Sequence, residues 1–183
     1  TLAREVTRRR ASAHSGGVRV VELAAVTDAA AVPDAVVTAL GLTSDGGAPL
    51  ATLRRARFMD LVVLLDNCEH VLDAVCEVLG AVMGTESSTL RVVATSRELL
   101  GMPDECAWPL QPLDCSRSDS PAQQFFRRRA DAARPGAVTA ADVDTISAIV
   151  RRLDGLPLAI ALAAARVATL GIADLGEQIE ASV

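Results

Sequence analysis

The feature that most constrains the fold is a run of five aliphatic residues, Leu61 to Leu65, that lies between Asp60 and Asp66. A run this short and this apolar predicts a parallel β-strand covered on both faces, because a strand with one face in water alternates apolar and polar side chains. Further strands are predicted at Val18–Leu23 and Leu90–Thr95, with a short one at Ala107–Pro109.

Segments with the helical spacing of apolar residues alternate with these strands. They cover residues 2–13, 33–40, 50–58 and 69–83, and a loop is predicted at Thr43–Pro49. Strands that alternate with helices of about ten to fifteen residues predict right-handed crossover connections. We therefore expect an α/β fold with a doubly wound, mostly parallel sheet.

From Ser120 onward the sequence predicts helices only. Ser120 and Pro121 form an N-cap and first-position pair, and Thr139 is a second N-cap. Further helices are predicted from Pro157 to Leu170 and from Ile172 to Val183. We expect two domains, an α/β domain over residues 1–115 and a small helical bundle over residues 116–183.

The composition excludes several classes of function. The net charge of −5 and the scarcity of aromatic residues, three Phe and one Trp, argue against binding of nucleic acid by this segment. Four cysteines without a CxxC pair argue against a zinc site. The longest apolar stretch, Leu156–Leu170, is shorter than the roughly 20 residues that cross a bilayer. We expect a cytoplasmic chain that does not associate with membranes.

Polar residues follow two of the predicted strands. Ligands of open parallel sheets gather at the carboxyl ends of strands, so Asp66 is placed to hold Mg²⁺ beside a phosphate, in a Walker B arrangement. The alternative is that Asp66 caps the following helix. After the next strand, Thr95, Ser96 and Arg97 bring hydroxyl groups and a guanidinium to the same edge. Arg97 can sense a terminal phosphate, or it can form a surface salt bridge with Glu98 or Glu69.

Three segments together resemble the NB-ARC-like ATPase domain of bacterial STAND regulators, the large LuxR-type and SARP-type transcriptional regulators. These segments are Leu64–Leu72, Arg91–Glu98 and Arg152–Ile160. They occur in the family's order and with suitable spacing over nearly the whole chain. The resemblance implies a switch that binds ATP or ADP with Mg²⁺ between a P-loop NTPase subdomain and a helical subdomain.

The resemblance also implies a role for each matching residue. Asp66 corresponds to the Walker B aspartate, and Asn67 stands where many such ATPases have a second acid, which puts efficient hydrolysis in doubt. Glu69 is a candidate substitute base, or simply an acid favoured at a helix N-terminus. Thr95 and Arg97 correspond to the sensor motif. Gly155 and Pro157 correspond to the GxP motif; from the residues alone, they also predict a corner between two helices.

A phosphate-binding loop is missing from the sequence. Such a loop needs a glycine-rich turn followed by a lysine, whereas all 18 basic residues here are arginine. Thr1–Val6 resembles the family's segment after that lysine, where one or two threonines precede a helix. We expect Thr1 to stand at, or one residue after, the Mg²⁺-binding threonine, so it is a candidate Mg²⁺ ligand, or else a helix N-cap. The resemblance implies that the sheet's first strand, central in the family, also lies outside the chain. We expect this chain alone to bind nucleotide very weakly.

The leading hypothesis is therefore an ATP- or ADP-binding regulatory module of a STAND-type transcriptional regulator. DNA would be bound only through regions outside this chain. The alternative hypothesis is a degenerate, non-catalytic domain that keeps the fold for self-association or for docking a partner. A stand-alone metabolic enzyme lacks any catalytic constellation in this sequence.

Overall fold

A computed structural model describes residues 1–43, 47–83 and 89–181. The chain divides into two compact units, Thr1–Ala107 and Trp108–Val183, and each is described by itself. Residues 44–46 of the predicted loop and residues 182–183 of the last predicted helix lie outside the described residues. None of the described helices is both long enough and apolar enough to cross a bilayer.

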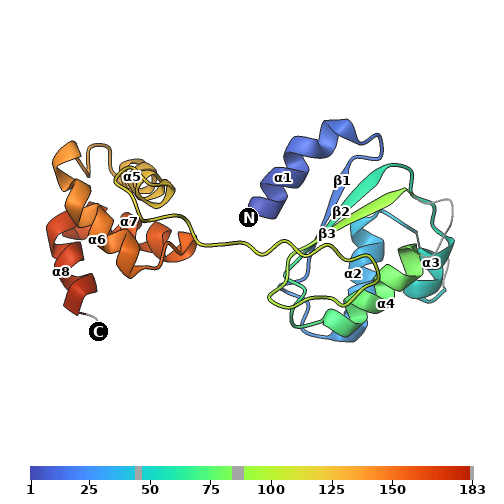
Figure 1. Cartoon of the computed structure of the whole chain (residues 1–183). Coiled ribbons are helices and arrows are strands. Elements are labelled where there is room, and N and C mark those ends of the chain that lie inside the picture. Colours follow the sequence, from blue (N-terminus) through green and yellow to red (C-terminus); the bar gives the residue numbers. More distant parts are fainter. Residues whose placement is uncertain (44–46, 84–88, 182–183) are drawn as a thin grey trace. The chain divides into compact units, whose positions relative to one another are not determined.

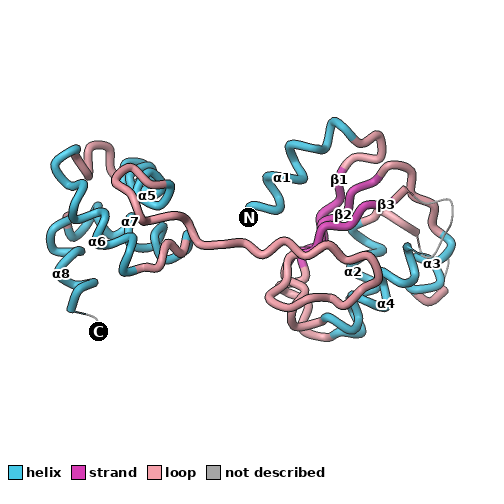
Figure 2. The backbone as a smooth tube through the Cα atoms, in the orientation of Figure 1, coloured by secondary structure: helices cyan, strands magenta, loops and turns pink. Residues whose placement is uncertain are grey.

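The first unit has a three-stranded parallel sheet with helices on both faces (Figures 1 and 2). The strands lie in the order β1-β2-β3, with Val18 opposite Val62 and Leu61 opposite Leu90. The expected α/β fold with a parallel sheet is confirmed. In chain order the elements are α1 (Leu2–Arg10), β1 (Val18–Glu22), α2 (Val32–Ala39), α3 (Pro49–Arg55), β2 (Leu61–Asp66), α4 (Leu72–Met83) and β3 (Leu90–Ala94), with 3-10 turns at Ala11–Ala13 and Ala29–Ala31.

The apolar run of the sequence forms the central strand. Leu61, Val63 and Leu65 pack into the core that also contains residues of α2, α3 and α4. Because successive side chains of a strand point to opposite faces, Val62 and Leu64 face away from this core. Helix α1 lies against that other face of the sheet (Figure 1). Leu64 is 0% exposed there. Burial on both faces explains why no polar residue interrupts the run.

The second unit is a bundle of helices. Its core includes Phe126 of α5, Ile146 and Ile149 of α6, and Ile160 and Val167 of α7. The helices are α5 (Pro121–Ala133), α6 (Val143–Arg152), α7 (Pro157–Leu170) and α8 (Ile172–Ala181), with a 3-10 turn at Ala140–Asp142 before α6. The expected helical part is confirmed.

The predicted helix boundaries of the bundle have clear capping chemistry. The Ser120 hydroxyl accepts a hydrogen bond from the Gln123 backbone N–H at 3.5 Å. Thr139 forms a capping box with Asp142, which starts the 3-10 turn that leads into α6. Gly171 ends α7 in a positive-φ conformation, at φ 81°.

Two local predictions were wrong. The helix expected from Glu69 begins at Leu72, because the backbone first turns after β2. Asn67 has φ 73°, and the Val71 N–H donates to the Cys68 carbonyl oxygen at 3.0 Å. The strand expected at Ala107–Pro109 does not form among the described residues, and Trp108 is 83% exposed. No described strand pairs with it, and Pro109 has no N–H to donate to a ladder.

Candidate functional site

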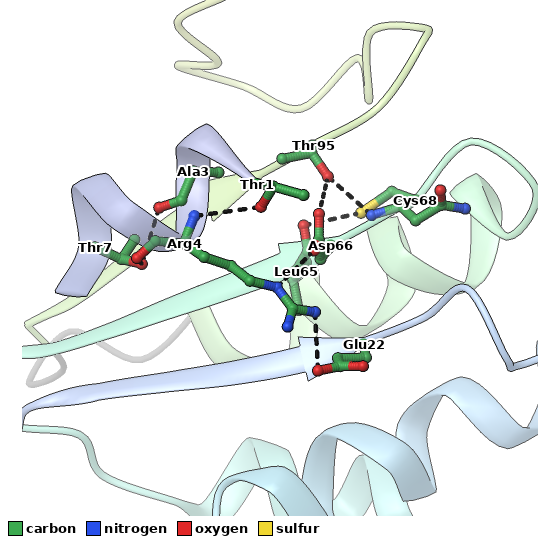
Figure 3. Close-up of polar contacts among 10 residues, drawn as sticks. Thr1, Ala3, Arg4, Thr7, Glu22, Leu65, Asp66, Cys68 and Thr95 are labelled. Atoms are coloured by element: carbon green, nitrogen blue, oxygen red, sulfur yellow. Dashed lines mark hydrogen bonds and ion pairs between the residues drawn. The ribbon is translucent and has the colours of Figure 1, made fainter. Parts of the chain in front are cut away.

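The candidate site lies at the carboxyl edge of the sheet (Figure 3). Glu22 and Asp66 are the last residues of β1 and β2 and stand opposite each other in the register. Thr95 directly follows β3. Parallel strands therefore bring these three polar residues, distant in sequence, to one edge.

Asp66 is held on both carboxylate oxygens. The Thr95 hydroxyl donates to Oδ1 at 2.7 Å, and Arg4 Nε donates to Oδ2 at 3.0 Å. The Asp66 side chain is only 13% exposed. The hydrogen bond from Thr95, followed by that from Arg4, lowers the pKa of Asp66 although burial opposes this shift. The residue is therefore a carboxylate at neutral pH.

Arg4 joins two strand ends to α1. Its Nη2 atom lies 2.8 Å from Glu22 Oε1, while its Nε atom contacts Asp66. These two carboxylates raise the pKa of Arg4. No sequence motif marks Arg4 as a site residue. The sequence predicts that Arg4 lies in the first turn of a helix, but no signal in the neighbouring residues indicates which strand ends that turn contacts.

Asn67 and His70 continue the contacts along the edge. The Asn67 backbone N–H donates to the Thr95 hydroxyl oxygen at 2.9 Å. Asn67 Nδ2 lies 3.3 Å from His70 Nδ1, and His70 Nε2 lies 3.1 Å from the Leu23 carbonyl oxygen and 2.9 Å from that of Val26. A polar network thus runs from Glu22 through Arg4, Asp66, Thr95 and Asn67 to His70, which returns to the segment after β1.

Thr1 acts as the N-cap of α1. Its hydroxyl accepts from the Arg4 backbone N–H at 3.4 Å, which is one of the two roles predicted for it. Thr1 is exposed, and within the described part of the chain its side chain forms no hydrogen bond with Asp66. Asp66 itself ends a strand and does not cap α4, so the capping alternative for Asp66 was wrong.

Arg97 and Glu69 are outside this polar network. Arg97 is exposed and Glu69 is half-buried, and neither side chain has a hydrogen bond or ion pair within residues 1–43, 47–83 and 89–181. The alternative salt bridge of Arg97 with Glu98 or Glu69 is not formed there. The guanidinium of Arg97 therefore has no hydrogen-bond or ion-pair partner among these residues.

Gly155 and Pro157 lie in the second unit and form the predicted corner between α6 and α7. Gly155 has φ 66°, and its carbonyl oxygen accepts from the Leu113 backbone N–H at 2.9 Å. A Cβ at this position would collide with the Leu113 carbonyl oxygen. Pro157 is the first residue of α7, where its missing N–H leaves no hydrogen bond unmade.

The oxygen atoms of Asp66 and Thr95 are the part of this edge that suits a divalent cation, although Thr95 and Arg4 already donate hydrogen bonds to the two Asp66 oxygens. Carboxylate and hydroxyl oxygens, as on Asp66 and Thr95, are ligands that Mg²⁺ prefers. The described residues contain no group of three or more His, Cys, Asp or Glu side chains that could hold a metal by themselves. The sequence has no glycine-rich loop with lysine to surround phosphates. The edge therefore supplies single oxygen ligands but no complete metal site among the described residues, and the sequence contains no phosphate cradle.

Comparison with known proteins links the chain to bacterial regulators. It is 33% identical over 169 residues to a protein of Mycobacterium tuberculosis (strain H37Rv) named as a candidate HTH-type transcriptional regulator, and equally to its Mycobacterium bovis counterpart. The alignment covers 90% of this chain and 18% of those proteins. A second Mycobacterium tuberculosis protein, whose name states no function, is 36% identical over 155 residues, which are 81% of this chain and 38% of that protein.

No family model and no solved structure matches the chain. The chain spans less than two fifths of the length of the curated relatives described above. Across 90% of its length, the chain is therefore similar to one segment of longer proteins that are named as candidate HTH-type transcriptional regulators.

Proposed function

We propose that this chain is the nucleotide-responsive regulatory module of a STAND-type transcriptional regulator. The observation that carries the proposal is the ionised Asp66 carboxylate at the carboxyl end of the central strand, oriented by Thr95. Ligands of parallel sheets bind at that edge. The similarity to segments of candidate regulators supports the regulatory part of the proposal.

In this proposal Asp66 serves the Mg²⁺ ion of bound ATP or ADP, with Thr1 as a second oxygen ligand. Thr95 orients the carboxylate, and Arg97 is available to a terminal phosphate because it has no partner among the described residues. Asn67 lacks the carboxylate that would activate water, so hydrolysis is slow, with Glu69 as the only substitute base proposed.

The helical part supplies the response. Gly155 and Pro157 fix the corner before α7, so a conformational change at this corner when nucleotide binds would change the direction of α7. Residues 1–115 then bind the nucleotide and residues 116–183 transmit its presence. The phosphate cradle and the DNA-binding surface would both lie in residues of a longer regulator outside this chain.

One observation favours the alternative function, a non-catalytic module for self-association or partner docking. Asp66 forms an ion pair with Arg4 through one carboxylate oxygen and accepts a hydrogen bond from Thr95 through the other. With these partners, the Asp66 carboxylate can have a purely structural role, in which it stabilises the fold and binds no ligand. The two functions differ in whether the longer protein binds nucleotide at all.

The test is titration of the longer regulator that contains this chain with ATP and ADP, with and without Mg²⁺. We expect Asp66→Asn to weaken Mg²⁺-dependent binding by about 10- to 100-fold. Asp73→Asn, on the exposed side of α4, is the matched control and should leave binding unchanged. No nucleotide binding by the longer regulator would refute the switch and support the docking module.

The isolated chain provides a second test. Without a phosphate cradle it should bind ATP very weakly. Micromolar affinity of the isolated chain would show that this chain contains its own phosphate site, and the assignment of the cradle to other regions would be wrong.

A further inference from the structure

The His70 ring joins two loops at the carboxyl edge of the sheet. Its Nε2 atom lies within hydrogen-bond distance of two backbone carbonyl oxygens, those of Leu23 and Val26. Carbonyl oxygens only accept, so Nε2 must carry the hydrogen. Its Nδ1 atom faces Asn67 Nδ2, which only donates, so Nδ1 carries none. The contacts on both sides of the ring therefore select one neutral tautomer.

The residue that His70 contacts has an unusual backbone. Asn67 adopts φ 73°, a left-handed conformation that asparagine tolerates better than most residues. In this conformation its N–H donates to the Thr95 hydroxyl oxygen, and that hydroxyl donates to Asp66 Oδ1. The turn at Asn67 thus decides where the Thr95 hydroxyl hydrogen points.

We propose that His70 is a positioning residue for the Asp66 carboxylate. In its Nε2–H tautomer it anchors the turn after β2 to the segment after β1 and holds the Asn67 side chain. The left-handed turn at Asn67 then keeps the Thr95 hydroxyl directed at Asp66. What the Asp66 carboxylate binds rests on the proposed function. Its positioning by His70 does not, because no ligand takes part in these contacts.

The tautomer can be read directly from long-range proton–nitrogen NMR spectra. The chain has two histidines, so His14→Gln leaves the signals of a single ring. At about pH 8, where imidazoles are mostly neutral, we expect the Nε2–H pattern for His70. An averaged pattern of the two tautomers would overturn the proposal.

Amide hydrogen exchange tests the positioning. We expect His70→Ala to speed exchange of the Asn67 N–H by about tenfold or more while exchange of the Leu64 N–H in β2 is unchanged. His70→Gln should largely restore protection, because its amide can donate to the carbonyls and accept from Asn67. His14→Gln, which alters the other histidine at the opposite end of the strands, should leave Asn67 unchanged.

Unchanged exchange at Asn67 in His70→Ala would overturn the proposal, as would equal acceleration at Leu64 and Asn67. Failure of rescue by His70→Gln would also count against it. These measurements use neither nucleotide nor metal. Their outcome is therefore independent of the nucleotide titrations that test the proposed function.

Discussion

Arg4 Nε donates to Asp66 Oδ2 at 3.0 Å, so the first turn of α1 is joined directly to the last residue of the central strand. The same guanidinium contacts Glu22 at the end of the neighbouring strand. Two carboxylates in register at one sheet edge repel each other unless a cation lies between them. Arg4 supplies that cation in this structure.

The first prediction concerns this ion pair. Arg4→Gln should lower the midpoint of thermal unfolding, because it leaves the mostly buried Asp66 carboxylate without its counter-charge. Arg8→Gln should have a smaller effect, because Arg8 pairs on the surface with Glu5 of its own helix. Differential scanning calorimetry of both variants decides the matter, and equal shifts would contradict the role given to Arg4.

The second prediction concerns the Thr95 hydroxyl, which both donates to Asp66 and accepts from the Asn67 N–H. Thr95→Val keeps the shape and removes both hydrogen bonds, so we expect a loss of about 1–3 kcal/mol in the free energy of unfolding by urea. In Thr7→Val the lost hydroxyl contacts only helix carbonyls, and the loss should stay below about 1 kcal/mol. A larger loss in the Thr7 variant would refute this ranking.

The third prediction compares two glycines with similar backbones. Gly155 and Gly136 both have positive φ, at 66° and 72°, but only at Gly155 would a Cβ collide with a neighbouring backbone, that of Leu113. Gly136→Ala should cost about 1–2 kcal/mol from the left-handed conformation alone. Gly155→Ala should cost about 2–5 kcal/mol. Urea unfolding followed by circular dichroism measures both, and similar losses would mean that Leu113 moves freely.

The fourth prediction is a pH dependence at the amino end of the strands. His14 and the Ser15 N–H both donate to Asp60, and these hydrogen bonds lower its pKa in the folded state. The stabilisation from Asp60 is therefore present above the ordinary carboxyl pKa of 3.8 and is lost as the pH falls below that value. Asp60→Asn should remove this part of the acid destabilisation.

Urea titrations between about pH 6 and pH 3 measure that dependence. Asp73→Asn is the control, because Asp73 is exposed and its side chain has no hydrogen bond or ion pair in the described ranges. If Asp60→Asn and the original chain lose stability in parallel over this range, the prediction is wrong.

The fifth prediction concerns thiol reactivity. Burial raises the pKa of the Cys68 thiol to about 12, and its side chain is 0% exposed, whereas Cys106 is exposed. A thiol reagent should therefore modify Cys106 of the native chain first, and Cys68 only when the first unit unfolds. Cys106→Ser should abolish the fast phase. Rapid labelling of Cys68 in the folded chain would contradict its burial.

Local chemistry made much of the fold predictable from the sequence. The aliphatic run at Leu61–Leu65 indicated a doubly covered strand, since an uninterrupted apolar strand is stable only between two layers. Ser120 and Thr139 marked the starts of helical turns because capping depends on residues within a few positions of each other. The same reasoning placed Asp66 and Thr95 at one sheet edge, where the structure joins them by a hydrogen bond.

Only the tertiary structure decided which partners these residues have. Arg4 and Asp66 are 62 positions apart, and His70 reaches carbonyl groups 44 and 47 positions before it. Such contacts depend on how a helix lies across the sheet and on the backbone of one turn, at Asn67. Apolar periodicity and capping residues predict only the helix or strand that contains them. The contacts of a side chain with another element are set by packing. The sequence alone therefore determined the three strands that form, most helices and the edge where a site would lie. Packing determined the polar network at that edge.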